Sequence, residues 1–162
     1  MNIERIVIVC CGVAAVGTGL AGGIFFAFSS FVMRALGVIP PRAGIAAMNA
    51  INVTVINPWF MLVFLGTALL SVALALASFR WWGSLDGALL LGASLLYLLG
   101  CFGVTMVRNV PLNDALAALG PDASDSTGLW SRYLVEWTRW NHVRTLSCLG
   151  SAILLLIVLM RR

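Results

Sequence analysis

Four long apolar segments constrain the fold of this chain more than any other feature of its sequence. They run from about Ile6 to Phe31, from Pro58 to Phe79, from about Leu89 to Val107, and over the apolar end Leu146 to Met160. A helix needs about 20 residues to cross the hydrocarbon core of a bilayer. The last segment is short for a span, so we expect its helix to begin earlier and the span to cover residues 142–160.

The composition excludes a soluble domain and indicates an integral membrane protein. The chain has 162 residues, of which 61% are hydrophobic and 10% are charged, and it contains no lysine. Such a composition cannot cover a globular domain with polar surface. The ten basic residues are arginines scattered singly or in pairs, so we expect no nucleic acid partner despite the formal charge of +4.

The connections between the segments predict how the helices are arranged. An even number of spans places both termini on one side of the membrane and the long connections, residues 34–57 and 108–140, on the other. Proline and glycine signals within these connections predict helices over residues 42–56 and 111–119, and a third helix that starts near residue 126 and runs into the fourth span. We therefore predict one all-α domain over residues 1–162, an antiparallel four-helix bundle with a cap formed by the two long connections.

The first span carries a pair of glycines at a spacing that favours close helix packing. Gly19 and Gly23 lie four residues apart. Small residues at this spacing let helix backbones approach closely in a membrane. We expect this pair to pack the first helix within the bundle and to take no part in chemistry.

The start of the fourth span combines aromatic and polar residues beside hydrocarbon. Trp137 and Trp140 precede the sequence Asn141-His142-Val-Arg144, which contains the only histidine of the chain. On a structural interpretation the tryptophans form an aromatic belt and Arg144 is a snorkelling anchor. On a functional interpretation His142 is a general base or proton carrier, and Asn141 and Arg144 are donors that stabilise an anion.

The helical spacing of the same region predicts a wall for a flat ligand. Three- and four-residue steps place Trp130, Tyr133, Trp137, Asn141 and Arg144 on one helical face. Rings ending in polar groups fit an aromatic or quinonoid molecule, although an interfacial aromatic stripe would show the same pattern. Two further amides, Asn49 and Asn52, lie on an amphipathic segment, where they are either solvated or in contact with the same ligand.

Several familiar chemistries have no counterpart in this sequence. One histidine and four cysteines, all four within predicted spans, show no metal-ligand spacing. A phosphate loop, a dinucleotide fingerprint and a nucleophile elbow are also missing, so we expect no metal and no other cofactor. No predicted span contains a carboxylate, which counts against a proton-driven transporter.

Four short motifs in a fixed order resemble the anthrone oxygenase family. They are Phe25-Phe-Ala-Phe28-Ser29, then Ala-Met48-Asn49-Ala-Ile-Asn52 followed by Asn57-Pro58, then Asn109-Val-Pro-Leu-Asn113-Asp114, and finally Trp137-x-x-Trp140-Asn141-His142-x-Arg144-Thr145. The resemblance covers nearly the whole chain, from about Gly17 to Leu155. It implies a short four-helix membrane protein of mostly bacterial distribution, and hence a location in the bacterial inner membrane.

The chemistry implied by this resemblance needs few protein groups. An anthrone loses a proton from its doubly benzylic carbon, and the enolate reacts with O2 without metal or flavin to give a quinone. The protein would supply a base, an anion-stabilising donor and a dry aromatic pocket. We infer that His142 is the base, that Arg144 acts with Asn141 or Asn113 on the oxyanion, and that the substrate-binding residues are Trp137, Trp140, Tyr133, Asn49, Asn52 and Asn109.

Three functions remain open on the sequence. The first is a cofactor-independent monooxygenase that acts on an anthrone, a phenol or another planar lipid-soluble substrate. The second is a non-catalytic membrane protein that binds a quinone, a lipid or a partner helix, and the third is a small transporter. The expected ligand is a hydrophobic aromatic small molecule or a lipid, and assembly into a homo-oligomer is left open.

Overall fold

The apolar segments form long helices throughout the part of the chain that the structure describes. The structure is a computed structural model that describes residues 3–119 and 126–162. Its long apolar helical segments, four within these ranges, cover Ile3–Val38, Pro58–Trp81, Leu85–Ala117 and Thr127–Met160. Each is long and apolar enough to cross a membrane, so the predicted all-α membrane bundle is confirmed.

The first half of the chain folds into one long helical run, a cap helix and a second spanning helix. Helix α1 (Ile3–Ala27) continues through a π-helical segment, η1 (Phe28–Val32), into α2 (Met33–Val38). The chain then reverses into α3 (Pro41–Thr54), and α4 (Pro58–Ser78) follows. The Asn57 side chain accepts hydrogen bonds from the backbone amides of Trp59 and Phe60 at 3.1 and 3.0 Å, which starts α4.

The second half consists of two further helical runs. A short turn, η2 (Phe79–Trp81), leads to α5 (Leu85–Leu95), which continues through the π-helical segments η3 (Leu96–Gly103) and η4 (Thr105–Asn109) into α6 (Val110–Ala117). The last helix, α7, runs without interruption over Ser126–Met160. The sequence predicted this start of α7 correctly, but it placed the end of the third helical run too early, at residue 107. The third helical run continues into α6 because Leu112 and Leu116 pack in the hydrophobic cluster that includes Met48 and Trp130.

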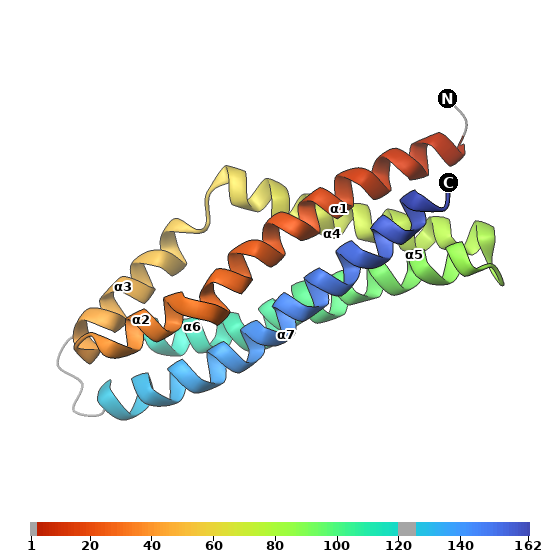
Figure 1. The fold of residues 1–162 in the computed structure, drawn as a ribbon. Coiled ribbons are helices and arrows are strands. Elements are labelled where there is room, and N and C mark those ends of the chain that lie inside the picture. Colours follow the sequence, from red (N-terminus) through yellow and green to blue (C-terminus); the bar gives the residue numbers. More distant parts are fainter. Residues whose placement is uncertain (1–2, 120–125) are drawn as a thin grey trace.

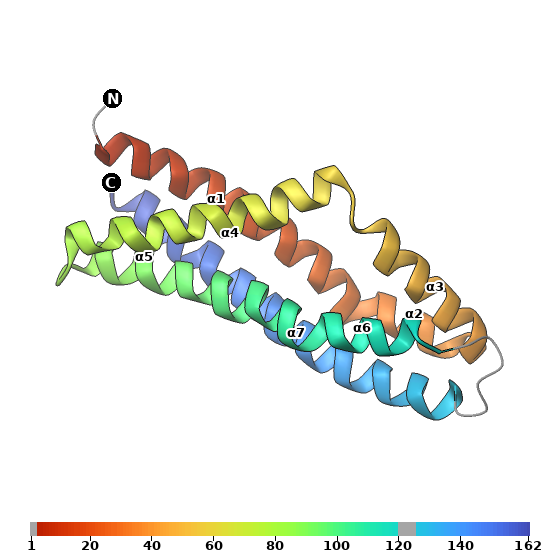
Figure 2. The same ribbon diagram turned by 180° about the vertical axis from the view of Figure 1, so that it is seen from behind.

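The two termini lie at one end of the molecule and the cap at the other (Figure 1). Helices α1, α4, α5 and α7 pack around one another, and α3 contacts both α6 and α7 at the cap end. Seen from behind, α3 and α6 again lie together beyond the end of α4 (Figure 2). Both long connections therefore meet over the same end of the bundle, and the predicted cap is confirmed. The cap is made of extensions of the bundle helices together with α3. The turn expected at Gly120-Pro121, after the predicted helix over residues 111–119, lies outside the described residues.

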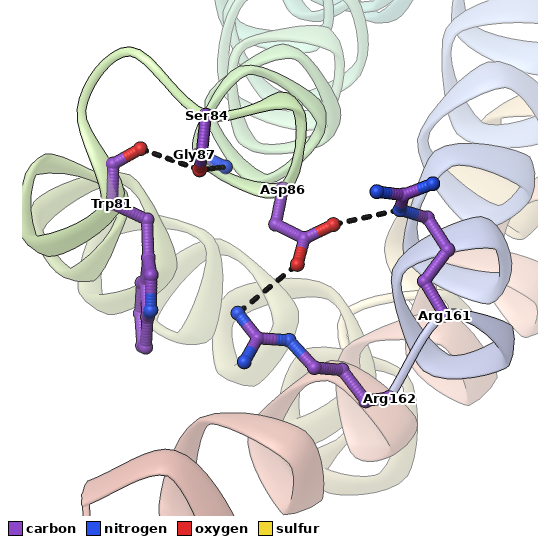
Figure 3. A network of polar contacts seen from close by, with 6 residues as sticks. All are labelled: Trp81, Ser84, Asp86, Gly87, Arg161 and Arg162. Atoms are coloured by element: carbon purple, nitrogen blue, oxygen red, sulfur yellow. Dashed lines mark hydrogen bonds and ion pairs between the residues drawn. The ribbon is translucent and has the colours of Figure 1, made fainter.

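An ionic contact closes the end of the bundle opposite the cap. Asp86 accepts from Arg161 at 2.8 Å and pairs with Arg162 at 3.1 Å, which joins the start of α5 to the end of α7 (Figure 3). The Arg162 guanidinium also lies 5.2 Å from the centre of the Trp81 ring. Charged and indole groups of this kind mark the membrane interface at the terminal end.

Close helix contacts occur at different glycines from those that the sequence predicted. Gly19 and Gly23 are exposed on the outside of the bundle, and a Cβ at either would meet no atom within 4 Å. A Cβ at Gly17 would instead overlap the Thr67 hydroxyl of α4, and one at Gly100 would overlap Ser147 of α7. The prediction was wrong because the buried face of α1 carries Gly17, which is offset around the helix from the Gly19 and Gly23 stripe.

A leucine at Gly17 should destabilise the protein, whereas a leucine at Gly19 should not. Overpacking of a tight contact costs about 1–3 kcal/mol, while leucine at an exposed helical position improves helix propensity. The free energy of unfolding in mixed detergent micelles, compared for Gly17→Leu and Gly19→Leu, measures the difference. An equal loss in Gly19→Leu would show that the outer face of α1 is packed against another chain.

Candidate functional site

A cavity of about 300 Å³ lies where the bundle meets the cap. Its wall draws on α1, η1, α3, α4, η4, α6 and α7, so residues far apart in sequence meet there. This volume is at the lower end of the range for small-molecule sites. The polar residues of the wall are Asn52, Thr105, Asn109, Asn113 and Arg144, and all others are apolar or aromatic.

The stripe predicted on the last helix forms one side of the site and the core behind it. Trp130, Tyr133, Trp137, Asn141 and Arg144 are all buried on a single face of α7. Of these, Trp137 and Arg144 reach the cavity wall. Trp130, Tyr133 and Trp137 stack in succession, with ring centres 5.6 and 6.2 Å apart, and this stacking fixes the orientation of the Trp137 ring.

Among the described residues, Arg144 is the only charged one of the cavity wall, and it is 4% exposed. Its guanidinium carbon lies 4.2 Å from the centre of the Phe25 ring and 5.0 Å from that of Trp137, so two aromatic faces flank the cation. Nη1 donates to Thr105 Oγ1 at 3.3 Å. Within residues 3–119 and 126–162 no carboxylate forms an ion pair with this side chain. The site is therefore electropositive in apolar surroundings.

Asn141 holds Arg144 in place and does not itself face the cavity. Its Oδ1 accepts from Arg144 Nη2 at 2.6 Å, and its Nδ2 donates to the Phe25 carbonyl at 2.6 Å and to Ser29 Oγ at 2.7 Å. The amide is completely buried and lies outside the cavity wall. Both of its polar atoms are committed to protein partners, so Asn141 acts as a positioning residue that ties α7 to α1 and η1.

The side chains of Asn113 and Asn109, on the wall opposite α7, hold the aromatic residues of α7 in place. Asn113 Oδ1 accepts from the Tyr133 hydroxyl and from Trp137 Nε1, both at 2.8 Å. Asn109 Nδ2 donates to the Trp137 carbonyl at 3.2 Å. These bonds fix η4 and α6 against α7, and they leave Asn109 Oδ1 without a partner among the described residues.

Several buried polar atoms around the cavity have no hydrogen-bond partner among the described residues. On the cavity wall these are Arg144 Nε, Asn109 Oδ1 and Asn52 Nδ2. Unpaired buried polar atoms are costly, and they are expected where a ligand completes the bonding. The apolar wall therefore offers two donors and one acceptor to a ligand.

Helical irregularities present these groups to the cavity. The π-helical segment η4 supplies Thr105, Met106 and Asn109, and η1 supplies Phe28. An inserted π turn rotates the following residues about the helix axis, and such turns are frequent at functional sites. The irregular segments therefore place wall residues that a regular helix would direct elsewhere.

The structure separates some of the predicted site residues from the cavity. Asn52, Asn109, Asn113, Trp137 and Arg144 line it, whereas Asn141 and Tyr133 stand directly behind these residues. His142 is exposed and does not line the cavity, so the structure does not bring it together with these residues, and its assignment as the base stays a prediction. The reason is that His142 follows Asn141 by one residue, about 100° around α7.

Trp140 and Asn49 also lie away from the cavity wall. Trp140 is half-buried and carries the Arg108 guanidinium 4.7 Å from its ring centre, which is the arrangement of an interfacial anchor. Asn49 is partly buried on α3, one turn before Asn52, and its Oδ1 has no partner in the described chain.

Sequence reasoning missed much of the apolar wall. Phe25, Phe28 and Met48 were noticed only as parts of motifs, and Phe60, Phe64 and Thr105 were not assigned to the site at all. Aromatic residues on spanning helices are found facing lipid, the protein core or a ligand, so hydropathy could not assign these residues to the cavity wall. The Asn57 cap that starts α4 was the one local signal near Phe60.

The polar groups of the wall suit an organic ligand. They are amides, one hydroxyl and one guanidinium, which are hydrogen-bonding groups. Residues 3–119 and 126–162 contain no group of three or more His, Cys, Asp or Glu side chains that could hold a metal ion. Whether the protein works without metal or other cofactors stays a prediction.

The fold and the site define a helical membrane protein with an apolar cavity whose wall includes a buried cation. Over residues 59–154, more than half of the chain, the sequence matches the family model described as anthrone oxygenase. The chain therefore belongs to the anthrone oxygenase family. No curated protein and no solved structure matches it. The matched range includes Asn109, Asn113, Trp137 and Arg144, whereas the α1 and α3 walls of the cavity lie outside it.

Removing the Asn113 amide should destabilise the protein more than the same change at Asn49. Asn113→Leu leaves the Tyr133 hydroxyl and the Trp137 indole nitrogen without an acceptor, at a cost of about 1–3 kcal/mol for each buried group. Asn49→Leu removes an amide whose oxygen already lacks a partner, and should change stability little. Unfolding free energies of the two variants in the same micelles test this, and equal losses would contradict the bonding described for Asn113.

Proposed function

We propose that this protein is a membrane-embedded monooxygenase that oxidises an anthrone-like or phenolic planar substrate with O2. The observation that carries the proposal is the buried Arg144 guanidinium, which faces an apolar cavity and has no carboxylate partner within the described chain. Membership of the anthrone oxygenase family supports the same substrate class.

The buried cation would act first on the acidity of the substrate. A positive charge within about 4–6 Å of an acid favours its ionised form, by about 1–3 pKa units. Enolisation of an anthrone places negative charge on the carbonyl oxygen, where Arg144 Nε and Asn52 Nδ2 are available as donors. Asn109 Oδ1 is available to accept from a substrate hydroxyl. Phe25, Phe28 and Trp137 would hold the rings.

The oxidation itself needs only the enolate and O2. The CH2 carbon of the substrate loses a proton, the enolate passes one electron to O2, and the resulting carbon radical and superoxide combine to form a carbon–oxygen bond. The peroxide anion takes up a proton, the second C–H proton leaves, and the O–O bond breaks to give a ketone and hydroxide, which takes up the departing proton to form water. One oxygen atom enters the product and the other leaves as water. The protein contributes the anion-stabilising charge and a site from which bulk water is excluded.

Two proton acceptors are compatible with this reaction. The cavity wall contains no carboxylate or imidazole among the described residues. The proton is transferred either to water at the membrane interface or to His142. Transfer to His142 requires that the CH2 group of the substrate reach His142 before the enolate enters the cavity. The same wall favours a second candidate function, the non-catalytic binding of a phenol or quinone, because binding requires no base.

Replacing Arg144 by glutamine should abolish most turnover of anthrone to anthraquinone. Loss of one preorganised anion-stabilising group costs about 100- to 1,000-fold in rate. Quinone formation and O2 uptake by the protein in vesicles, with chelator present, measure the effect. Arg139→Gln is the matched control, because Arg139 is an exposed arginine on the same helix outside the cavity wall, and it should keep wild-type turnover.

A His142→Gln variant distinguishes the two routes for the proton. A general base that is lost lowers the rate by about 100- to 10,000-fold, whereas an exposed residue without contact to the substrate leaves it near the wild-type value. The geometry favours the second result.

Wild-type turnover by Arg144→Gln would overturn the proposal, and binding of a hydroxyanthraquinone without any oxidation of anthrone would favour the non-catalytic function.

A further inference from the structure

We infer that the ligand enters the cavity sideways from the membrane, through an apolar mouth beneath the corner between α3 and α4. We place this mouth among three exposed residues of the cavity wall, Ile24 on α1, Ile56 at the corner and Met106 on η4. The inference rests on the proposed function, since it concerns the route by which the proposed substrate reaches Arg144.

The exposure of the wall residues locates the mouth. Ile56 is 71% exposed, Met106 49% and Ile24 40%, while the polar groups of the wall are buried or partly buried. A residue that both lines a cavity and is exposed marks the place where the cavity reaches the surface. All three are apolar, so the mouth has no group that would stabilise bulk water in it. An apolar mouth of this kind faces lipid at low cost.

The lengths of the helices place the mouth at the edge of the hydrocarbon core. The charged residues at the terminal end, Arg5, Arg80, Asp86 and Arg161, mark one interface. A hydrocarbon core of about 30 Å corresponds to about 20 helical residues. Counting that length along each helix leads to Phe25 on α1, Phe60 on α4, Met106 on η4 and Asn141 on α7. Three of these four residues line the cavity, and Asn141 holds Arg144.

Interfacial side chains lie at the same level and support this placement. Trp59, next to Phe60, is 80% exposed. Trp140, next to Asn141, carries the exposed Arg108 guanidinium against its ring. Tryptophan and arginine are enriched at the boundary between hydrocarbon and headgroups. A planar molecule with one polar edge partitions to the same boundary for the same reason, and it therefore concentrates directly at the mouth.

A tryptophan at Ile56 should slow both the entry and the exit of a ligand. The probe is 1,8-dihydroxyanthraquinone, a planar phenol that is already oxidised, in phosphatidylcholine vesicles that hold the full-length protein. Binding is followed by quenching of tryptophan fluorescence. We expect Ile56→Trp, and independently Met106→Trp, to lower the association and dissociation rates together by about tenfold. Val53→Trp is the matched control, because Val53 is 74% exposed near the end of α3 and does not line the cavity.

A second arm of the experiment separates entry from lipid and entry from water. A probe tethered to a diacyl phospholipid cannot leave the bilayer, so entry from lipid predicts that the tethered probe still binds and that Ile56→Trp slows its binding. Wild-type rates in both mouth variants, or no binding of the tethered probe to a protein that binds the free probe, would overturn the lateral route. If Arg144→Gln still weakens affinity in that case, the proposed function stands. If the wild-type protein binds no probe, the proposed function fails and the route fails with it.

Discussion

The burial of an unpaired guanidinium is the constraint on which the cap end of this structure depends. Removing an ion from water costs on the order of several kcal/mol after relaxation of its surroundings. Arg144 meets this cost with two aromatic faces, an amide oxygen and a hydroxyl, and no carboxylate contributes within the described chain. The charge is therefore stabilised but not neutralised, and it can act on a ligand.

The remaining elements of the cap keep this charge in place and buried. Asn141 joins the guanidinium to the Phe25 carbonyl and to Ser29, so α1 and η1 are fixed by the same contact that orients the cation. Asn113 and Asn109 fix the third helical run against Trp137. Helix α3 closes the remaining side with Met48 and Asn52. Each helix of the bundle thus contributes through its cap-side end, and the ionic contact of Asp86 closes the other end.

The sequence predicted those features that depend on periodicity and composition. The membrane bundle followed from the apolar segments, and the three- and four-residue steps on α7 correctly grouped Trp130, Tyr133, Trp137, Asn141 and Arg144 on a buried face. The same steps exclude His142 from that face. Its assignment to the site relied on its chemical type, and helical geometry places it on another face of α7, outside the cavity wall.

Other features depend on interactions that no local pattern records. The π-helical turns in η1 and η4 place Phe28 and Thr105 on the cavity wall, and nothing in hydropathy predicts such turns. The choice between Gly17 and Gly19 for close packing depends on which face of α1 meets α4. Composition allows either face, since the lipid-facing side and the packed side of a membrane helix are both apolar. Only the assembled bundle distinguishes them.

The central claim, that Arg144 stabilises an anion within the cavity, is tested most directly by the ionisation of a bound phenol. The absorbance of 1,8-dihydroxyanthraquinone reports its deprotonation, and the titration can be followed in vesicles with the wild-type protein, with Arg144→Gln and without protein. The account predicts that binding to the wild-type protein lowers the pKa of the phenol by about 1–3 units relative to the protein-free membrane, and that Arg144→Gln removes this shift. An unshifted or raised phenol pKa in the wild-type complex would contradict it.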